Sequence, residues 1–279
     1  MRIRIAHSPD SDDAFMFYPL VEGKIDTRGL EIEHVLADIE TLNREAMKGT
    51  YEVSAISFHA YPYVADKYLV LPSGGSIGDG YGPVVVAREE LTYLRGRSVA
   101  VPGTFTTAFL TLKLYEPSLR EKVVPFNEVL NEVERGTVDA GLVIHEGQLT
   151  YRDHGLVKVV DLGEWWKERY GLPLPLGCNV VRKDLGKELV RKVEALMRES
   201  VEYALRERER ALAYARAYAR ELEGDEERTS RFVSMYVNAR TVDLGEDGRE
   251  SVRLLLKLGR EKGIIKAEIP RIIFSDEWV

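Results

Sequence analysis

The histidines of this 279-residue chain are the side chains best suited to proton transfer near neutral pH. His145 directly follows the apolar run of residues 140–144, which predicts a β-strand, and it precedes Glu146 and Gly147. The end of a strand in an α/β sheet faces the usual ligand cleft, so a general base would be well placed there. His7 ends another predicted strand and could face the same cleft. A structural role is nonetheless more common for a histidine at a strand end, and the residues alone leave both interpretations open.

A second candidate site is the turn at residues 101–109, Val-Pro-Gly-Thr-Phe-Thr-Thr-Ala-Phe. Its apolar residues recur at i, i+3, i+4 and i+7, which predicts the buried face of a helix. Thr104 is a suitable N-cap, and the amides of Thr106, Thr107 and Ala108 would then be free at the first turn. Free amides and the helix dipole bind anions, and threonine hydroxyls add donors without charge, which suits a carboxylate better than a diphosphate. A simply capped helix is the alternative, and both remain open.

Two further segments contain residue types found in ligand sites. Asp10, Asp12 and Asp13 could bind a metal such as magnesium, but they precede the apolar residues 14–17, where acidic side chains cap a helix. No other ligand at metal-site spacing accompanies them, so capping and loop shaping are favoured. The glycine-rich residues 73–82 lead into a predicted strand rather than a helix, unlike a phosphate-binding loop. We expect a flexible connection beside a cleft there.

Composition and charge exclude several classes of protein. The chain has 46 acidic and 39 basic residues, a net charge of −7, whereas a nucleic-acid binder needs a basic face. Its single cysteine, Cys178, cannot form an internal disulfide or a multi-cysteine metal site. No apolar run is long enough to span a membrane, and the N-terminus does not read as a signal peptide. We therefore expect a cytoplasmic protein, with an excess of Arg and Glu that is typical of thermophiles.

The order of predicted elements indicates an α/β fold with mostly parallel sheets. We expect strands at residues 2–6, 30–36, 51–57, 69–71, 83–87, 98–101, 122–126, 139–144, 157–162 and 179–181. We expect helices from residue 14 and at residues 39–47, 58–63, 105–114, 127–135 and 165–170, and a mainly helical last hundred residues.

The chain crosses twice between two αβ units, near residues 88–92 and 177–182. This pattern predicts two lobes with a ligand cleft between them. The large lobe would be discontinuous and comprise residues 1–90 and 178–279, and the small lobe would comprise residues 91–177.

Four segments together resemble the 1,4-dihydroxy-6-naphthoate synthase family of the futalosine route to menaquinone. They are His-Ser-Pro-Asp-Ser-Asp-Asp-Ala-Phe-Met-Phe (7–17), Pro-Gly-Thr-Phe-Thr-Thr-Ala (102–108), Gly-Leu-Val-Ile-His-Glu-Gly-Gln-Leu-Thr-Tyr (141–151) and Leu-Pro-Leu-Pro-Leu-Gly (172–177). The resemblance runs from the first strand to the C-terminal helices. It implies the two-lobed fold of type II periplasmic binding proteins, in agreement with the crossing pattern.

The resemblance also implies an activity and its residues. The family acts on cyclic dehypoxanthinyl futalosine, a carboxylated bicyclic precursor, and splits it into the naphthoate and a three-carbon fragment. Such an enzyme is a carbon–carbon lyase that needs no cofactor and has no nucleic-acid or membrane partner. The family's histidine base falls on His145, and its substrate-binding positions fall on Ala55, Ile56, Ser57, Thr107 and Ala108.

Two other functions share this fold. A solute-binding protein of a transporter would normally carry an export signal or lipid anchor, and we expect neither here. Chorismate dehydratase, an enzyme of the same pathway, also takes a carboxylate substrate. A DNA-binding regulator would need an added helix-turn-helix domain, for which the predicted elements leave no place.

Overall fold

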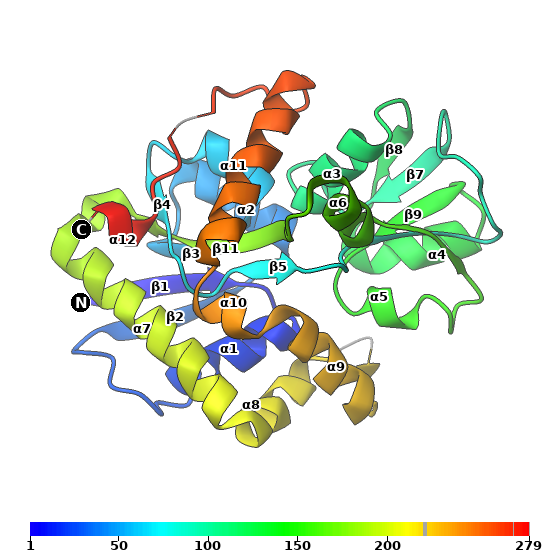
Figure 1. Ribbon diagram of the computed structural model, residues 1–279. Helices are drawn as coiled ribbons and strands as arrows, with labels where there is room; N and C mark the ends of the chain where they lie inside the picture. The colour runs from blue at the N-terminus through cyan, green and yellow to red at the C-terminus, as the bar shows by residue number, and fades with distance from the viewer. Residues whose placement is uncertain (220–221, 270, 279) are drawn as a thin grey trace.

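The computed structural model describes residues 1–219, 222–269 and 271–278, and its two lobes lie side by side (Figure 1). Each lobe is a β-sheet flanked by helices, which confirms the predicted α/β class. The N-terminus and the last helix, α12 (Ser275–Trp278), lie on the first lobe, at the end remote from the second lobe.

The sheet of the first lobe is assembled around the first strand of the chain. Within the described residues it has six strands, in the order β2-β1-β3-β11-β4, with β5 paired to β11. β1 is parallel to both β2 and β3, whereas β11 is antiparallel to β3, β4 and β5. These strands are β1 (Arg2–His7), β2 (Glu31–Leu36), β3 (Val53–Ser57), β4 (Tyr68–Val70), β5 (Ser76–Gly78) and β11 (Leu174–Arg182).

The second sheet is built from the middle of the chain, and the described residues give it five strands in the order β10-β6-β9-β7-β8. β7 is parallel to β8 and β9, and β6 is antiparallel to β9 and β10. These strands are β6 (Val84–Ala87), β7 (Ser98–Val101), β8 (Arg120–Val123), β9 (Ala140–Val143) and β10 (Val157–Asp161).

Both sheets are mixed, so the prediction of mostly parallel sheets was wrong in this respect. The two strands that follow the crossings, β6 and β11, each enter a sheet against the direction of their neighbours. The chain also crosses between the lobes at other residues than predicted. β6 already pairs within the second sheet, although the predicted boundary at residue 90 placed it in the large lobe. Likewise β11 begins at Leu174, before the predicted return at residue 178.

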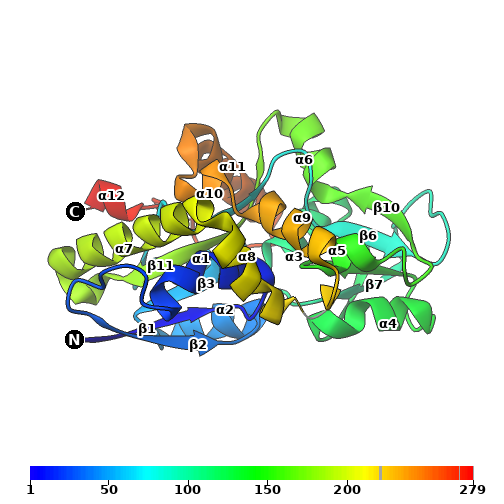
Figure 2. The same cartoon turned by 90° about the horizontal axis from the view of Figure 1, so that it is seen from below.

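Helices cover the faces of the two sheets (Figures 1 and 2). Those of the first lobe are α1 (Ser11–Val21), α2 (Ile39–Lys48), η1 (Phe58–Tyr63), η3 (Lys183–Leu185), α7 (Gly186–Arg206), α8 (Arg208–Ala215), η4 (Arg216–Tyr218), α9 (Glu226–Tyr236), α10 (Ala239–Val242), α11 (Gly245–Glu261) and α12. Those of the second lobe are α3 (Thr107–Tyr115), η2 (Phe126–Glu128), α4 (Val129–Glu134), α5 (Gly147–Thr150) and α6 (Leu162–Tyr170). No helix of the described ranges is both long and apolar enough to cross a membrane.

Helix α1 is held firmly because it is apolar on nearly all sides. Its residues 14–18 and Leu20 are buried in the core shared with β1, α7 and α8. A helix that is apolar all round is stable only when other elements surround it. The loop before α1 therefore starts from a fixed strand, β1, and ends in a fixed helix, which gives residues 8–13 a defined position.

The glycine-rich residues 73–82 contain a strand, β5, that the sequence did not predict. Pairing of β5 with β11 orders this connection at the boundary between the lobes. Its glycines allow close backbone contact: a Cβ on Gly78 would lie 1.9 Å from the carbonyl oxygen of Tyr81. The segment is therefore shaped by backbone packing rather than by a bound phosphate.

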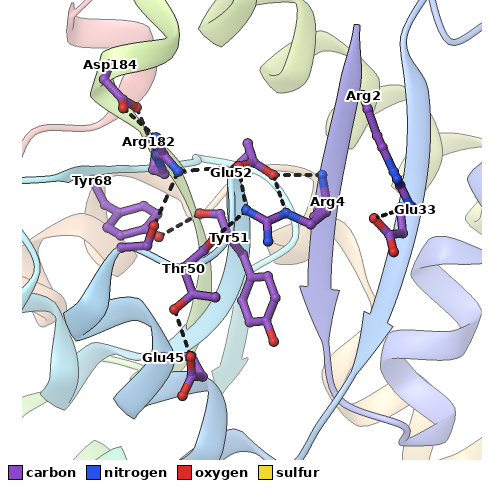
Figure 3. A network of polar contacts seen from close by, with 11 residues as sticks. Arg2, Arg4, Glu33, Glu45, Thr50, Tyr51, Glu52, Tyr68, Arg182 and Asp184 are labelled. Carbon is purple, nitrogen blue, oxygen red and sulfur yellow. Dashed lines mark hydrogen bonds and ion pairs between the residues drawn. The ribbon is translucent and has the colours of Figure 1, made fainter.

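A network of charged side chains lies at the amino end of β3 (Figure 3). Glu52, just before this strand, accepts hydrogen bonds from Arg4 Nε at 2.9 Å and Nη2 at 2.8 Å. Arg182 of β11 contacts the same carboxylate at 3.3 Å and pairs with Asp184. We call Arg4, Glu52, Arg182 and Asp184 the Glu52 network. Every charge in it has an opposite partner.

Candidate functional site

A pocket between the lobes contains all six residues that the sequence assigned to the site. Ala55, Ile56 and Ser57 line it from the end of β3, Thr107 and Ala108 from the first turn of α3, and His145 from the turn after β9. The other lining residues are Ser8, Asp10, Asp12, Asp13, Met16, Ile39, Gly74, Ser76, Pro83, Thr106, Ile144, Gln148, Leu176, Gly177, Cys178, Asn179, Phe232 and Tyr236. The predicted cleft thus exists, and both lobes form its walls.

Ser57 is fixed by a buried asparagine that the sequence analysis did not identify. The Ser57 amide donates to Asn43 Oδ1 at 2.8 Å, and Asn43 Nδ2 donates to Ser57 Oγ at 3.2 Å. Asn43 Nδ2 also reaches the carbonyl of Phe105 in the other lobe at 3.3 Å. Among the hydrogen bonds of the described residues Ser57 Oγ is an acceptor and donates to no group, so its proton is available to a ligand. The sequence signal for this role was the position of Asn43 three residues before apolar Ala46, on the same face of the predicted helix.

Helix α3 begins later than predicted, and its N-cap is Thr106 rather than Thr104. Thr106 Oγ1 accepts the amide of Phe109 at 3.1 Å and donates to the carbonyl of Gly103 at 3.0 Å. Thr107 Oγ1 donates to the carbonyl of Leu176 at 2.6 Å. These two hydroxyls thus hold the helix start in place, contrary to the expectation that they would serve a ligand.

The backbone amides of Thr107 and Ala108 remain as the donors at this helix start. Among the hydrogen bonds of the described residues, neither amide has an acceptor. Both residues line the pocket and are buried, so the positive end of the helix dipole acts where water is largely excluded. This wall of the pocket can bind an anionic group without a basic side chain.

In contrast to the anion-binding amides of α3, His145 lies beside a negatively charged side chain, that of Asp10. Its Nδ1 lies 2.9 Å from Asp10 Oδ2, and its ring packs edge-on against Phe126 with centroids 5.1 Å apart. Its backbone has a φ of +58°, a left-handed conformation that is uncommon for residues other than glycine. Such strained residues cluster at functional sites.

Three aspartates at the N-cap and in the first turn of α1 line the same pocket. Asp10 occupies the N-cap position but makes no side-chain capping hydrogen bond, and Ser8 Oγ donates to it at 2.7 Å. Asp12 and Asp13 lie in the first helical turn, as the capping interpretation predicted. These carboxylates also form a wall of the pocket, which was not expected from the sequence.

Burial dominates the electrostatics of these aspartates. It raises the pKa of Asp12 well above its usual value, with the charges of Asp13 and Asp10 acting in the same direction. Burial, followed by the charge of Asp10, raises the pKa of Asp13 to about 6. Asp12 Oδ1 is buried without a hydrogen-bond partner. No Lys or Arg is among the described residues that line the pocket.

Two other candidates of the sequence lie outside the pocket. His7 is buried, with its Nε2 3.1 Å from His34 Nδ1 and its ring stacked on Phe17. Burial lowers the pKa of His7 to about 3, and the residue is not part of the pocket lining among the described residues. Glu146 is buried beside the pocket and accepts a hydrogen bond from Ser11 Oγ at 2.6 Å.

The C-terminal half contributes residues that sequence reasoning did not find. Tyr236 of α9 donates to Gln148 Oε1 of α5 at 2.6 Å, and both line the pocket. Figure 2 shows these two helices next to each other at the boundary of the lobes. Cys178 also lines the pocket, and its burial raises the pKa of the thiol. Within the described ranges, no three His, Cys, Asp or Glu side chains are grouped so as to hold a metal ion.

Solved structures of other proteins share this two-lobed arrangement. A periplasmic aliphatic sulphonate binding protein from Escherichia coli superimposes with a TM-score of 0.67 at 14% identity, over 98% of this chain and 92% of that one. At that identity the likeness concerns the fold alone. A crystal structure of a protein from Archaeoglobus fulgidus is 50% identical, with a TM-score of 0.90 over 95% of this chain and 98% of that one. The protein therefore has a periplasmic-binding-protein-like fold, as expected from the sequence.

Sequence comparisons define the family. The family model described as menaquinone biosynthesis matches residues 3–261. A 1,4-dihydroxy-6-naphthoate synthase from Thermus thermophilus is 45% identical over 98% of both chains. A second one, from Streptomyces coelicolor, is 37% identical over 95% of both chains. The chain belongs to the menaquinone biosynthesis family of enzymes.

Proposed function

We propose that this protein is a 1,4-dihydroxy-6-naphthoate synthase that cleaves cyclic dehypoxanthinyl futalosine into 1,4-dihydroxy-6-naphthoate and a three-carbon fragment. The observation that carries the proposal is the meeting of His145, Ser57 and the start of α3 in one pocket of a menaquinone-family chain. The reaction belongs to the carbon–carbon lyases, and we place it in the cytoplasm.

The substrate carboxylate would bind at the wall formed by α3. The amides of Thr107 and Ala108 would donate to its oxygens, and the Ser57 hydroxyl, held by Asn43, would add a third donor. Ala55 and Ile56 would pack against the apolar rings of the substrate.

His145 would act as the general base. Cleavage requires removal of a proton while negative charge develops in the substrate, and neutral imidazole is a base available at pH 7. The nearby carboxyls of Asp12 and Asp13 are the competing bases, because burial raises their pKa values. His145 also has the contact to Asp10 that an imidazole base needs for orientation.

The charge of the pocket disfavours chorismate dehydratase, the alternative within the same pathway. Chorismate carries two carboxylates, and among the described lining residues the donors that we assign to an anion lie at one wall, formed by the start of α3 and Ser57. A second carboxylate would meet the wall of Asp10, Asp12 and Asp13, with no Lys or Arg among the described lining residues to offset the repulsion. A substrate with one carboxylate and a neutral polar end fits both walls.

The test is to incubate the purified protein separately with cyclic dehypoxanthinyl futalosine and with chorismate, and to identify the products by mass. We expect 1,4-dihydroxy-6-naphthoate from the first substrate and no change in the second. Dehydration of chorismate, or no conversion of the first substrate, would refute the proposal.

A further inference from the structure

The loop before α1 brings a carboxylate of the first lobe onto His145 of the second lobe. Asp10 Oδ2 lies 2.9 Å from His145 Nδ1, and Ser8 Oγ donates to the same oxygen at 2.7 Å. The two side chains are largely buried, with 10% of Asp10 and 18% of His145 exposed. Burial strengthens a hydrogen bond that involves a charge, because little water competes for it.

The backbone at His145 makes such a contact necessary. Its φ of +58° is unfavourable for a side chain with a Cβ, so the surrounding structure must hold it. The next residue, Glu146, accepts a hydrogen bond from Ser11, the first residue of α1. The Phe126 ring packs against the imidazole in an edge-to-face arrangement. Asp10 and Ser11 therefore anchor two consecutive residues of the turn.

We propose that Asp10 is a positioning residue that keeps the proton of neutral His145 on Nδ1 and orients the imidazole toward the pocket. A carboxylate at 2.9 Å accepts only from a protonated nitrogen, so the lone pair lies on Nε2. Ser8 fixes the carboxylate in turn through its hydroxyl. The kinetic part of this inference rests on the proposed function, whereas the tautomer does not.

Other charged groups surround His145, and they act differently from Asp10. Asp12 and Asp13 influence it through their charges. Glu146 is its neighbour in sequence, and its carboxylate is bonded to Ser11. Asp13 Oδ2 accepts the amide of Ser8 at 2.7 Å. Asp13→Asn therefore removes a nearby charge while leaving the Asp10–His145 contact in place, which makes it the matched control.

The direct test is ¹⁵N NMR of histidine-labelled protein, with the His145 signals assigned from a His145→Gln sample. We expect wild-type His145, when neutral, to be protonated on Nδ1. In Asp10→Ala, the tautomer protonated on Nε2 should become populated, while Asp13→Asn keeps the wild-type pattern. Identical tautomers in wild type and Asp10→Ala would overturn the inference, whether or not the protein cleaves the proposed substrate.

Kinetics provide the second test. Asp10→Ala should lower kcat by ~10²-fold or more, as expected for a base held in the wrong tautomer, with a much smaller change in KM. Asp10→Asn should also move the acid limb of the pH profile of kcat/KM to lower pH, because it removes a negative charge beside the imidazole. An equal loss of kcat in Asp13→Asn and Asp10→Ala would mean that only charge matters, and would overturn the positioning role. Circular dichroism would confirm that each variant is folded.

Discussion

The two ends of the first sheet treat their carboxylates differently. At the amino end of β3, Glu52 is paired with Arg4 and Arg182. At the carboxyl ends of β1 and β3, three aspartates face a pocket whose described lining has no Lys or Arg. The pKa of Glu52 is lowered, chiefly by its hydrogen bonds from Arg4. The pKa values of Asp12 and Asp13 are raised, chiefly by burial. The same sheet thus pairs its carboxylate with arginines at one end, whereas at the other end the carboxylates are buried in a pocket whose described lining has no Lys or Arg.

This difference indicates that the charges at one end of the sheet serve stability and those at the other end serve function. Charges that are paired within the protein need no ligand, and removal of one partner destabilises the fold because the other charge is left unpaired. Buried carboxylates without cations destabilise it, and proteins retain such groups where function requires them. We therefore expect substitutions at the Glu52 network to change stability, and substitutions at the pocket to change binding or turnover.

The largest effect is expected at His145. His145→Asn should lower kcat by ~10²–10⁴-fold, or roughly 3–5 kcal/mol of barrier, because the positioned base is lost. Binding of a naphthoate-like acid should persist, since the amides at the start of α3 are untouched. The measurement is kcat together with the Kd from calorimetry, with Glu146→Gln as control. A near-normal kcat, or a greater loss in Glu146→Gln, would refute the assignment.

The Glu52 network should show the opposite behaviour. Glu52→Gln removes the charged partner of Arg4 and Arg182, which should lower the free energy of unfolding by about 1.5–3 kcal/mol. The exposed pair of Arg2 and Glu33 supplies the control, because Glu33→Gln should cost less than about 1 kcal/mol. Urea denaturation measures both variants. Equal losses would show that burial of the network contributes nothing.

The raised pKa of Asp13 predicts a dependence of stability on pH. Between its unfolded value of 3.8 and its folded value of about 6, the folded state keeps a proton that the unfolded state has released. The free energy of unfolding should therefore fall as pH rises through this window, by on the order of 1–3 kcal/mol, and then level off.

Asp13→Asn should remove this fall, whereas Asp66→Asn, at an exposed carboxylate, should keep it. Urea denaturation of wild type and both variants at intervals from pH 4 to pH 7 measures the slope. A wild-type slope that persists in Asp13→Asn would locate the titration elsewhere.

The smallest effect is expected at the carboxylate wall. Ser57→Ala should weaken binding of a naphthoate-like acid by roughly 1–2 kcal/mol, the usual loss for one hydrogen bond to a charged group. Ser54→Ala is the matched control in β3, because Ser54 is buried outside the pocket and bonds to the carbonyl of Ala55. Calorimetry should give an unchanged Kd for the control. The same Kd in all three proteins would mean that the carboxylate binds elsewhere.

Local patterns explain what could be predicted from the sequence. Alternation predicted β1, and the apolar run before His145 predicted β9, so the position of His145 at a strand end followed directly. The start of α3 was placed two residues too early, because the Thr-Phe-Thr-Thr run offers several possible caps. Only the geometry of the folded turn selects Thr106 over Thr104.

Contacts between distant segments explain what could not be predicted. The pairing of Asp10 with His145 joins residues 135 positions apart, and nothing near either residue signals it. Tyr236 and Gln148 meet only because α9 of the first lobe contacts α5 of the second lobe. The antiparallel entry of β6 and β11 likewise depends on how the two crossings are threaded between the lobes.

We infer that the amino end of β3 serves stability and that the pocket at its carboxyl end serves turnover. The most direct test is the turnover number per folded molecule. It is measured for Glu52→Gln and His145→Asn at saturating cyclic dehypoxanthinyl futalosine. We expect Glu52→Gln to keep the wild-type value although it is less stable, and His145→Asn to lose at least ~10²-fold while it stays folded. Similar losses of turnover in the two variants would contradict this division.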